Sequence, residues 1–246
     1  MFKRSSYLVI ILLLLIQFIS CLPRSPSSDL VDVILPRTTT ITPSVGENAV
    51  PSGHNSFEEA FHKGLINFQN FRLQQTNQIA KDVLADPSMY SIDSEAMQKK
   101  LSVLRKYVTD SNEALNKVLP ADQLGPYTRF FFAGDKDVVI QRFDRFNRSH
   151  ASKTEPLTPE EQVTRDALKK RGVVEYDKEV DKRYKEYLHY LVDEFEIYVK
   201  TLSATEKEKD KDMKDMMAAW NAYTKNEGGM DKTAFGQRLF QINFKL

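Results

Sequence analysis

The sequence predicts an all-α protein, an antiparallel helical bundle of about six to seven helices that follows a disordered N-terminal arm. Apolar side chains recur at steps of three and four from residue 56 onward, which is the spacing of a buried helix face. Capping sequences precede several of these stripes, and no segment shows the sustained alternation of a β-strand. The long helices are joined by short polar connections, which favour antiparallel neighbours.

The start of the chain is typical of a secretory signal peptide. Two basic residues precede a nearly uninterrupted apolar run from Tyr7 to Ile19. A run of about 13 residues is too short to cross a hydrocarbon core about 30 Å thick as a helix. We therefore predict that residues 1–21 are a signal peptide, cleaved after Cys21, and that the protein is secreted. The alternatives are an uncleaved membrane anchor and a lipoprotein acylated on Cys21.

Cysteine usage and charge restrict the class of protein. Cys21 is the single cysteine, so a mature chain cut after it has no disulfide and must fold by packing alone. The chain has 35 Lys and Arg residues against 34 Asp and Glu residues, and loss of Lys3 and Arg4 leaves 33 against 34. No overall field attracts nucleic acid. We expect no nucleic-acid partner and no stable membrane span after cleavage.

Residues 22–55 differ in composition from the rest of the chain. Five prolines lie among clustered serine and threonine residues. Such a segment cannot bury enough apolar surface to offset the entropy lost on ordering. We predict a disordered arm that acts as a spacer; a propeptide and an O-glycosylated stretch are alternatives.

The helical domain is predicted to occupy residues 56–246. Ser56 with Glu59 forms a capping box that begins a first helix, which ends near Asp86-Pro87. The apolar stripe of this helix includes Phe57, Phe61, Leu65, Phe68, Phe71, Ile79 and Val83. A second helix begins at residue 93 or 94 and stops at Pro120.

The middle of the domain is predicted from its glycines, prolines and caps. Residues 121–134 should form a loop and a short helix closed by Gly134, before a third helical face that contains Phe143 and Phe146. Thr158 followed by Pro159 and two glutamates is a strong helix start, and Gly172 suits the end of that helix. A helix of about 28 residues should follow.

The C-terminal part is predicted to contain two further helices. Ser203 with Glu206 forms another capping box, and the charged run behind it is expected to be a helix that projects into solvent. A methionine-rich apolar face then leads to Gly228-Gly229, and a last helix begins at Asp231. We treat residues 56–246 as one domain; a division near residues 149–157 is the alternative.

Two E-x-x-H sequences are the sharpest metal-site signal in the sequence. They are Glu59 with His62 and Glu186 with His189, and di-iron bundles use two such motifs with further glutamates. Each residue advances about 100° around a helix, which places both motifs away from the apolar stripes. We therefore expect all four side chains on the solvated surface, and we predict neither a metal site nor a cofactor.

Residues 142–148 alternate arginine with aromatic residues. Arg142, Arg145 and Arg148 should form an exposed ridge that suits an anion or a partner carboxylate, while Phe143 and Phe146 turn inward. An ordinary amphipathic helix with a basic outer face is the simpler interpretation. Asn147 begins the single N-glycosylation sequon and is predicted to be exposed beside the ridge.

Function is predicted only as a class. The chain has no G-x-S-x-G elbow, P-loop, G-x-G-x-x-G or H-E-x-x-H sequence, and we assign no catalytic residues. The sequence favours a secreted helical binding or interaction protein without catalysis, whose partner is an extracellular protein, a glycan or an apolar ligand. The alternative is an extracellular carrier that holds an apolar small molecule or lipid between its helices.

Overall fold

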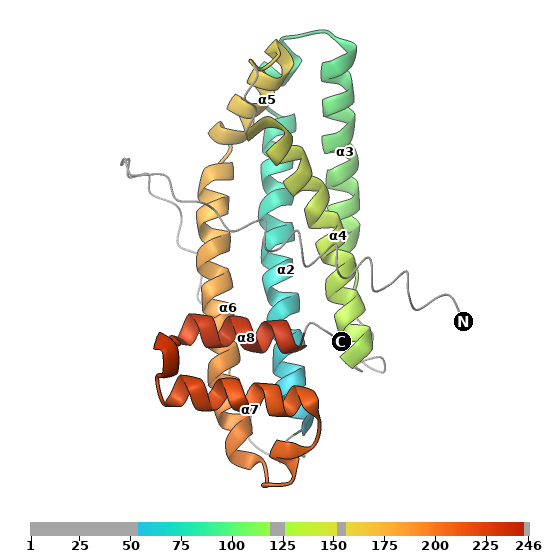
Figure 1. Ribbon diagram of the computed structural model, residues 1–246. Helices are drawn as coiled ribbons and strands as arrows, with labels where there is room; N and C mark the ends of the chain where they lie inside the picture. The colour runs from blue at the N-terminus through green and yellow to red at the C-terminus, as the bar shows by residue number, and fades with distance from the viewer. Residues whose placement is uncertain (1–53, 119–125, 152–155, 244–246) are drawn as a thin grey trace, which may run out of the picture. The chain divides into compact units, whose positions relative to one another are not determined.

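The computed structural model describes residues 54–118, 126–151 and 156–243. These residues belong to one compact unit, residues 49–246, and are helical without a β-strand among them (Figure 1). The all-α prediction is therefore confirmed. The predicted signal peptide, residues 1–21, lies outside the described residues, and so does the predicted arm as far as residue 53.

Seven α-helices account for most of the described chain. They are α2 (His54–Leu84), α3 (Glu95–Asn116), α4 (Pro126–Ala151), α5 (Pro159–Lys170), α6 (Val173–Thr201), α7 (Lys211–Thr224) and α8 (Lys232–Asn243). Short 3-10 turns lie between some of them, at Pro87–Tyr90, Glu206–Glu208 and Glu227–Gly229. Within the described ranges, no helix combines the length and the apolar character needed to cross a membrane.

Helix α2 is the centre of the bundle. It packs against α3, α4 and α6, and Figure 1 shows α6 on one side of it with α3 and α4 on the other. The helices α2, α3, α4 and α6 alternate in direction, as short connections require. The last two helices, α7 and α8, instead run across α6, and α8 packs directly on it (Figure 1).

Two hydrophobic clusters fill the bundle. The first joins the second half of α2 to α3, α4, α5 and the start of α6, with Leu101, Leu104, Phe143 and Leu168 almost fully buried. The second joins the end of α6 to α7 and α8 around Phe195, and Phe57 of α2 reaches it. The stripes read from the sequence supply both clusters, so burial of apolar surface explains why these helices associate.

Several predicted helix ends are confirmed. The Thr158 hydroxyl accepts a hydrogen bond from the Glu161 amide at 3.3 Å, and the Glu161 carboxylate accepts one from the Thr158 amide at 3.0 Å. Ser94 caps α3 by accepting a bond from the Met97 amide. Gly172 has φ 89°, a left-handed conformation that glycine adopts without strain, so the chain turns there from α5 into α6.

Two predicted boundaries are wrong. Helix α2 already begins at His54, so Ser56 lies inside it and is not its cap. Gly134 does not close a short helix, because α4 runs through it without a break. Phe132, Ala133 and Ile140 line the inner side of α4 on both sides of this glycine. Their burial outweighs the cost of about 1 kcal/mol that a glycine imposes inside a helix.

The charged run after α6 also differs from its prediction. Ser203 and Glu206 form both bonds of a capping box, but these begin a 3-10 turn of three residues. Helix α7 starts only at Lys211, where the Asp210 carboxylate accepts a bond from the Met213 amide at 2.8 Å. No apolar side chain precedes Met213 in this run, so packing supports a helix only from there.

A glycine allows α8 to cross α6 at close range. A Cβ atom at Gly236 would lie 2.5 Å from the carbonyl oxygen of Leu188, which is part of the α6 backbone. Leu188 cannot move that oxygen without displacing α6. The backbones of the two helices are therefore in direct contact at this point, and a larger residue would force them apart.

We predict that Gly236→Ala lowers the free energy of unfolding by about 1–3 kcal/mol, because the added methyl group overlaps the Leu188 carbonyl. Urea denaturation followed by circular dichroism measures this loss. Gly134→Ala is the matched control, since a Cβ there meets nothing within 4 Å, and it should be neutral or slightly stabilising. Equal effects of the two substitutions would contradict the close crossing.

Candidate functional site

The two E-x-x-H pairs do not form a metal site in the structure. Glu59 and Glu186 are exposed, and Glu59 pairs with Arg129 of α4 at 3.2 Å. His189 is half-buried, and its Nε2 lies 2.9 Å from the Thr233 hydroxyl of α8. Among the described residues, no three His, Cys, Asp or Glu side chains are grouped so that they could hold a metal.

His62 is buried, which corrects the prediction that it is solvated. Only 4% of it is exposed, and its Nδ1 donates to the Glu58 carbonyl oxygen at 2.7 Å. The prediction placed His62 by its angle from a single apolar stripe. Helix α2 is central, however, and other helices cover it on more than one side. His62 lies within about 20° of Leu73, which is fully buried. Burial lowers the pKa of its imidazole, although the bond to Glu58 opposes this.

A buried ionic cluster at the middle of α2 was not predicted. The guanidinium of Arg72 donates to the Asp144 carboxylate at 2.6 Å, to Asp137 at 3.4 Å and to the Tyr176 hydroxyl at 3.4 Å. The Gln69 amide also donates to Asp137, at 2.9 Å. We call these five residues the Arg72 cluster. It connects α2 to α4 through two carboxylates and to α6 through one hydroxyl.

The charges in the Arg72 cluster depend on one another. Burial disfavours the charged form of Arg72, but Tyr176 and the two carboxylates outweigh this and raise the pKa of its guanidinium. Burial raises the pKa of the Asp144 carboxyl, while Arg72 opposes the shift. The charge of Arg72 is therefore stabilised mainly by its partners, which is the arrangement of a structural ion pair.

The sequence contained one signal for this cluster. Arg72 falls within the apolar stripe of α2, about 40° from Phe68 and about 20° from Ile79. A charged residue on a buried helix face needs a counter-charge, and Asp137 and Asp144 stand seven residues apart on one side of α4. Their pairing with Arg72 still could not be derived, because no sequence pattern shows that α2 and α4 are neighbours.

Further polar contacts attach α2 to α3. The Thr76 hydroxyl lies 2.6 Å from the Tyr107 hydroxyl, and the Asn77 amide donates to the Ser111 hydroxyl at 2.5 Å. All four side chains are buried. Together with the Arg72 cluster, these bonds fix the position of α2 relative to three other helices.

The predicted arginine ridge lies on the outer side of α4. Arg142, Arg145 and Arg148 are exposed, whereas Phe143 and Phe146 are buried, as expected. Arg142 forms an ion pair with Asp110 of α3. The other two fold back onto their own helix: Arg145 donates to the Gln141 carbonyl at 3.2 Å and Arg148 to the Asp144 carbonyl at 3.3 Å.

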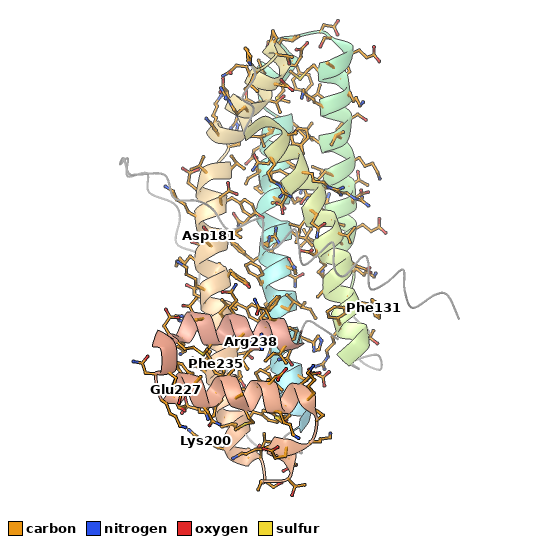
Figure 2. All side chains as sticks on the ribbon, in the orientation of Figure 1. Phe131, Asp181, Lys200, Glu227, Phe235 and Arg238 are labelled. Carbon is orange, nitrogen blue, oxygen red and sulfur yellow. The ribbon has the colours of Figure 1, made fainter. Side chains whose placement is uncertain are left out.

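Exposed apolar side chains lie on the same outer side of α4, nearer the start of the helix. Phe131 is 57% exposed and Val138 is 43% exposed. Figure 2 labels Phe131 on α4, away from α8 and its labelled residue Phe235. Gly134 lies between them with nothing near the position of its missing side chain. Val118, directly after α3, is 81% exposed.

These residues form a surface that we call the α3–α4 face. It comprises Lys106, Asp110, Glu113, Lys117, Val118, Phe131, Gly134, Asp135, Val138, Arg142 and Arg145. Lys117 pairs with Asp135 at 2.7 Å and Lys106 pairs with Asp110 at 3.1 Å. The face therefore has an apolar end near the start of α4 and a mainly basic end toward its C-terminus.

Asn147 lies elsewhere than the sequence suggested. It is half-buried and falls about 140° around α4 from Arg142, on the side of Ile140 and Phe143. The expectation of an exposed sequon beside the ridge is therefore wrong in its geometry. Glycosylation of Asn147 stays a prediction, and a glycan there would leave α4 on the side opposite Arg142 and Arg145.

A hollow in the described structure lies at the connection between α6 and α7. It measures about 730 Å³, is open to solvent, and is lined by Ala204, Thr205, Glu206, Glu208 and Lys209. A carrier of an apolar molecule needs an enclosed site with apolar walls. This hollow is open to solvent rather than enclosed and does not meet that requirement, so the carrier hypothesis stays a prediction from the sequence.

We predict that Arg72→Met lowers the free energy of unfolding by about 3–5 kcal/mol, because it leaves the buried Asp137 carboxylate and the partly buried Asp144 carboxylate without a counter-charge. Adding Asp137→Asn and Asp144→Asn should recover part of this loss. Arg183→Met is the control, because its pair with Glu179 is exposed and should contribute less than about 1 kcal/mol. A triple variant less stable than Arg72→Met alone would contradict the assignment.

We predict that the burial of His62 makes stability depend on pH. Its pKa in the folded state is below the ordinary 6.5, so the unfolded chain binds more protons as the pH falls through 6.5. The urea midpoint should therefore decrease between pH 7.5 and pH 5.5, and His62→Gln should reduce the decrease. His189→Gln serves as the control. An identical pH profile for wild type and His62→Gln would refute this effect.

Comparison with known proteins adds no assignment to these residues. No protein-family model matches the chain, no curated protein is significantly similar to it, and no solved structure matches its fold. The roles given to the Arg72 cluster and to the α3–α4 face therefore rest on the contacts of this chain alone.

Proposed function

We propose that this chain is a secreted helical protein that binds another extracellular protein through the α3–α4 face and does not act as an enzyme. One observation carries this proposal. Seven large apolar side chains are exposed among the described residues, and three of them belong to the α3–α4 face. These are Val118, Phe131 and Val138. Exposed apolar residues gathered on one surface are characteristic of an interaction site.

The contacts on the inner side of α4 favour binding through its outer side. The inner side is fixed by the bonds from Arg72 to Asp137 and Asp144, and by the burial of Phe143. Lys136 adds a bond from its ammonium group to the Ala114 carbonyl near the end of α3. A surface held in place before binding loses less conformational entropy when a partner arrives.

The composition of the α3–α4 face favours a protein over a glycan. Phe131 and Val138 offer apolar area, which protein side chains can cover. Asp110 lies between Lys106 and Arg142 and Asp135 lies among the apolar residues, and both would repel the sulfate groups of an acidic glycan. The predicted signal peptide supports an extracellular setting, since it would direct the chain into the secretory pathway.

Site-specific photo-crosslinking tests this function. The full chain is expressed in a secretory host, and its N-terminus is determined, with Leu22 as the expected first residue. A benzophenone amino acid then replaces Gly134 in the α3–α4 face or, as the matched control, Lys178 on the exposed side of α6. In medium from cells that naturally secrete the protein, position 134 should yield a discrete protein adduct that position 178 does not.

The outcome also discriminates between the alternatives. Equal labelling from positions 134 and 178, or no adduct from either, would contradict a partner-binding role for this face. A small apolar molecule released from the purified protein on denaturation, seen by native mass spectrometry, would favour the carrier instead.

A further inference from the structure

We infer that the α3–α4 face receives an acidic amphipathic α-helix of the partner, with apolar side chains over Phe131 and Val138 and carboxylates over Arg142 and Arg145. This inference rests on the proposed function and names the kind of partner for the same surface. Three features of the face support it: the spacing of the apolar residues, the gap at Gly134, and the separation of apolar from basic side chains.

The apolar end has the spacing of a helix-binding ridge. Phe131 and Val138 are seven residues apart, so they stand above one another two turns along α4, about 10.5 Å apart. Gly134 lies between them, and no atom approaches within 4 Å of the position of its missing Cβ. A side chain from another helix can enter this gap and contact the α4 backbone, as ridges of one helix pack into grooves of another.

The basic end begins one turn beyond Val138. Arg142 and Arg145 lie within about 60° of each other on the outer side of α4, and Lys106 of α3 reaches the Asp110 carboxylate that Arg142 also contacts. Guanidinium groups bind carboxylates through paired hydrogen bonds. A partner segment must therefore change from apolar to acidic along its length, over about 21 Å from Phe131 to Arg145.

The net charge of the face excludes a second copy of the chain as the favoured occupant. Four cationic side chains, Lys106, Lys117, Arg142 and Arg145, stand against the three carboxylates of Asp110, Glu113 and Asp135. The face therefore carries a formal charge of +1. Two such faces would repel each other, whereas an acidic partner would be attracted and oriented.

Other polyanions match the face less well. An anionic membrane or a sulfated glycan presents negative charge evenly, but Asp135 lies among the apolar residues and Asp110 lies between Lys106 and Arg142. A glycan would also leave Phe131 and Val138 uncovered. A protein helix can place its carboxylates only where the arginines are.

Fluorescence anisotropy with a defined peptide tests the inference. The probe is a labelled 18-residue synthetic helix with leucines at positions i, i+3, i+4 and i+7 in one half and glutamates in the other, alongside a peptide in which these residues are scrambled. The full secreted chain should bind the patterned helix at least ten-fold more tightly than the scrambled peptide. No preference for the patterned helix would overturn the inference.

Matched variants show whether binding uses the α3–α4 face. Phe131→Ser with Val138→Ser should weaken binding at least ten-fold, whereas Val174→Ser with Ile197→Ser, which removes exposed apolar side chains of α6, should leave it within two-fold. Arg142→Gln with Arg145→Gln should also weaken binding ten-fold, and Lys178→Gln with Lys185→Gln should not. Equal losses in test and control variants would overturn the inference.

Two further probes separate the possible anionic partners. Heparin and phosphatidylserine vesicles are measured with the same variants. The result that would overturn the acidic helix as the ligand is tighter binding of heparin or of the vesicles than of the patterned helix. That binding would have to be lost on Arg142→Gln with Arg145→Gln but kept on Phe131→Ser with Val138→Ser. If position 134 crosslinks a protein while the patterned helix shows no preference, the proposed function stands and this inference alone fails.

Discussion

The buried charge of Arg72 constrains the whole described bundle. A guanidinium group inside a helical core is tolerated only where counter-charges and hydrogen bonds replace the water that it loses. Asp137 and Asp144 come from α4 and Tyr176 comes from α6. One side chain of the central helix therefore sets the positions of two other helices, α4 and α6. Displacing α4 by even one turn would leave a buried charge unpaired.

This constraint explains why α4 has two distinct sides. Its inner side carries Asp137, Asp144 and the buried aromatic Phe143, which contact α2 and α3. Its outer side carries ion pairs to α3 and, beside them, the exposed side chains of Phe131 and Val138. Exposed apolar residues on a helix that is already anchored cost solubility without adding stability, and the proposed binding role would account for them.

The features that were predicted correctly from the sequence are those that depend on residues close by in the sequence. The cap at Thr158, the helix start next to Ser94 and the turn at Gly172 are local, and the structure has them as expected. The errors concern residues whose environment comes from distant parts of the chain. His62 was placed in solvent because one stripe was taken as the whole buried face, and the partners of Arg72 lie 65 and 72 residues further along the chain. Phe131 belonged to a predicted short helix, so its exposure could not be derived.

Hydrogen exchange measured by mass spectrometry on Arg72→Met tests most directly whether the Arg72 cluster holds α4 in place. The account predicts faster exchange in α4 between residues 137 and 144 and in the facing part of α2, with the α7 and α8 amides unchanged, since those helices pack on α6 around Phe195 and Gly236. Unchanged protection in α4, or an equal increase in every helix, would contradict it.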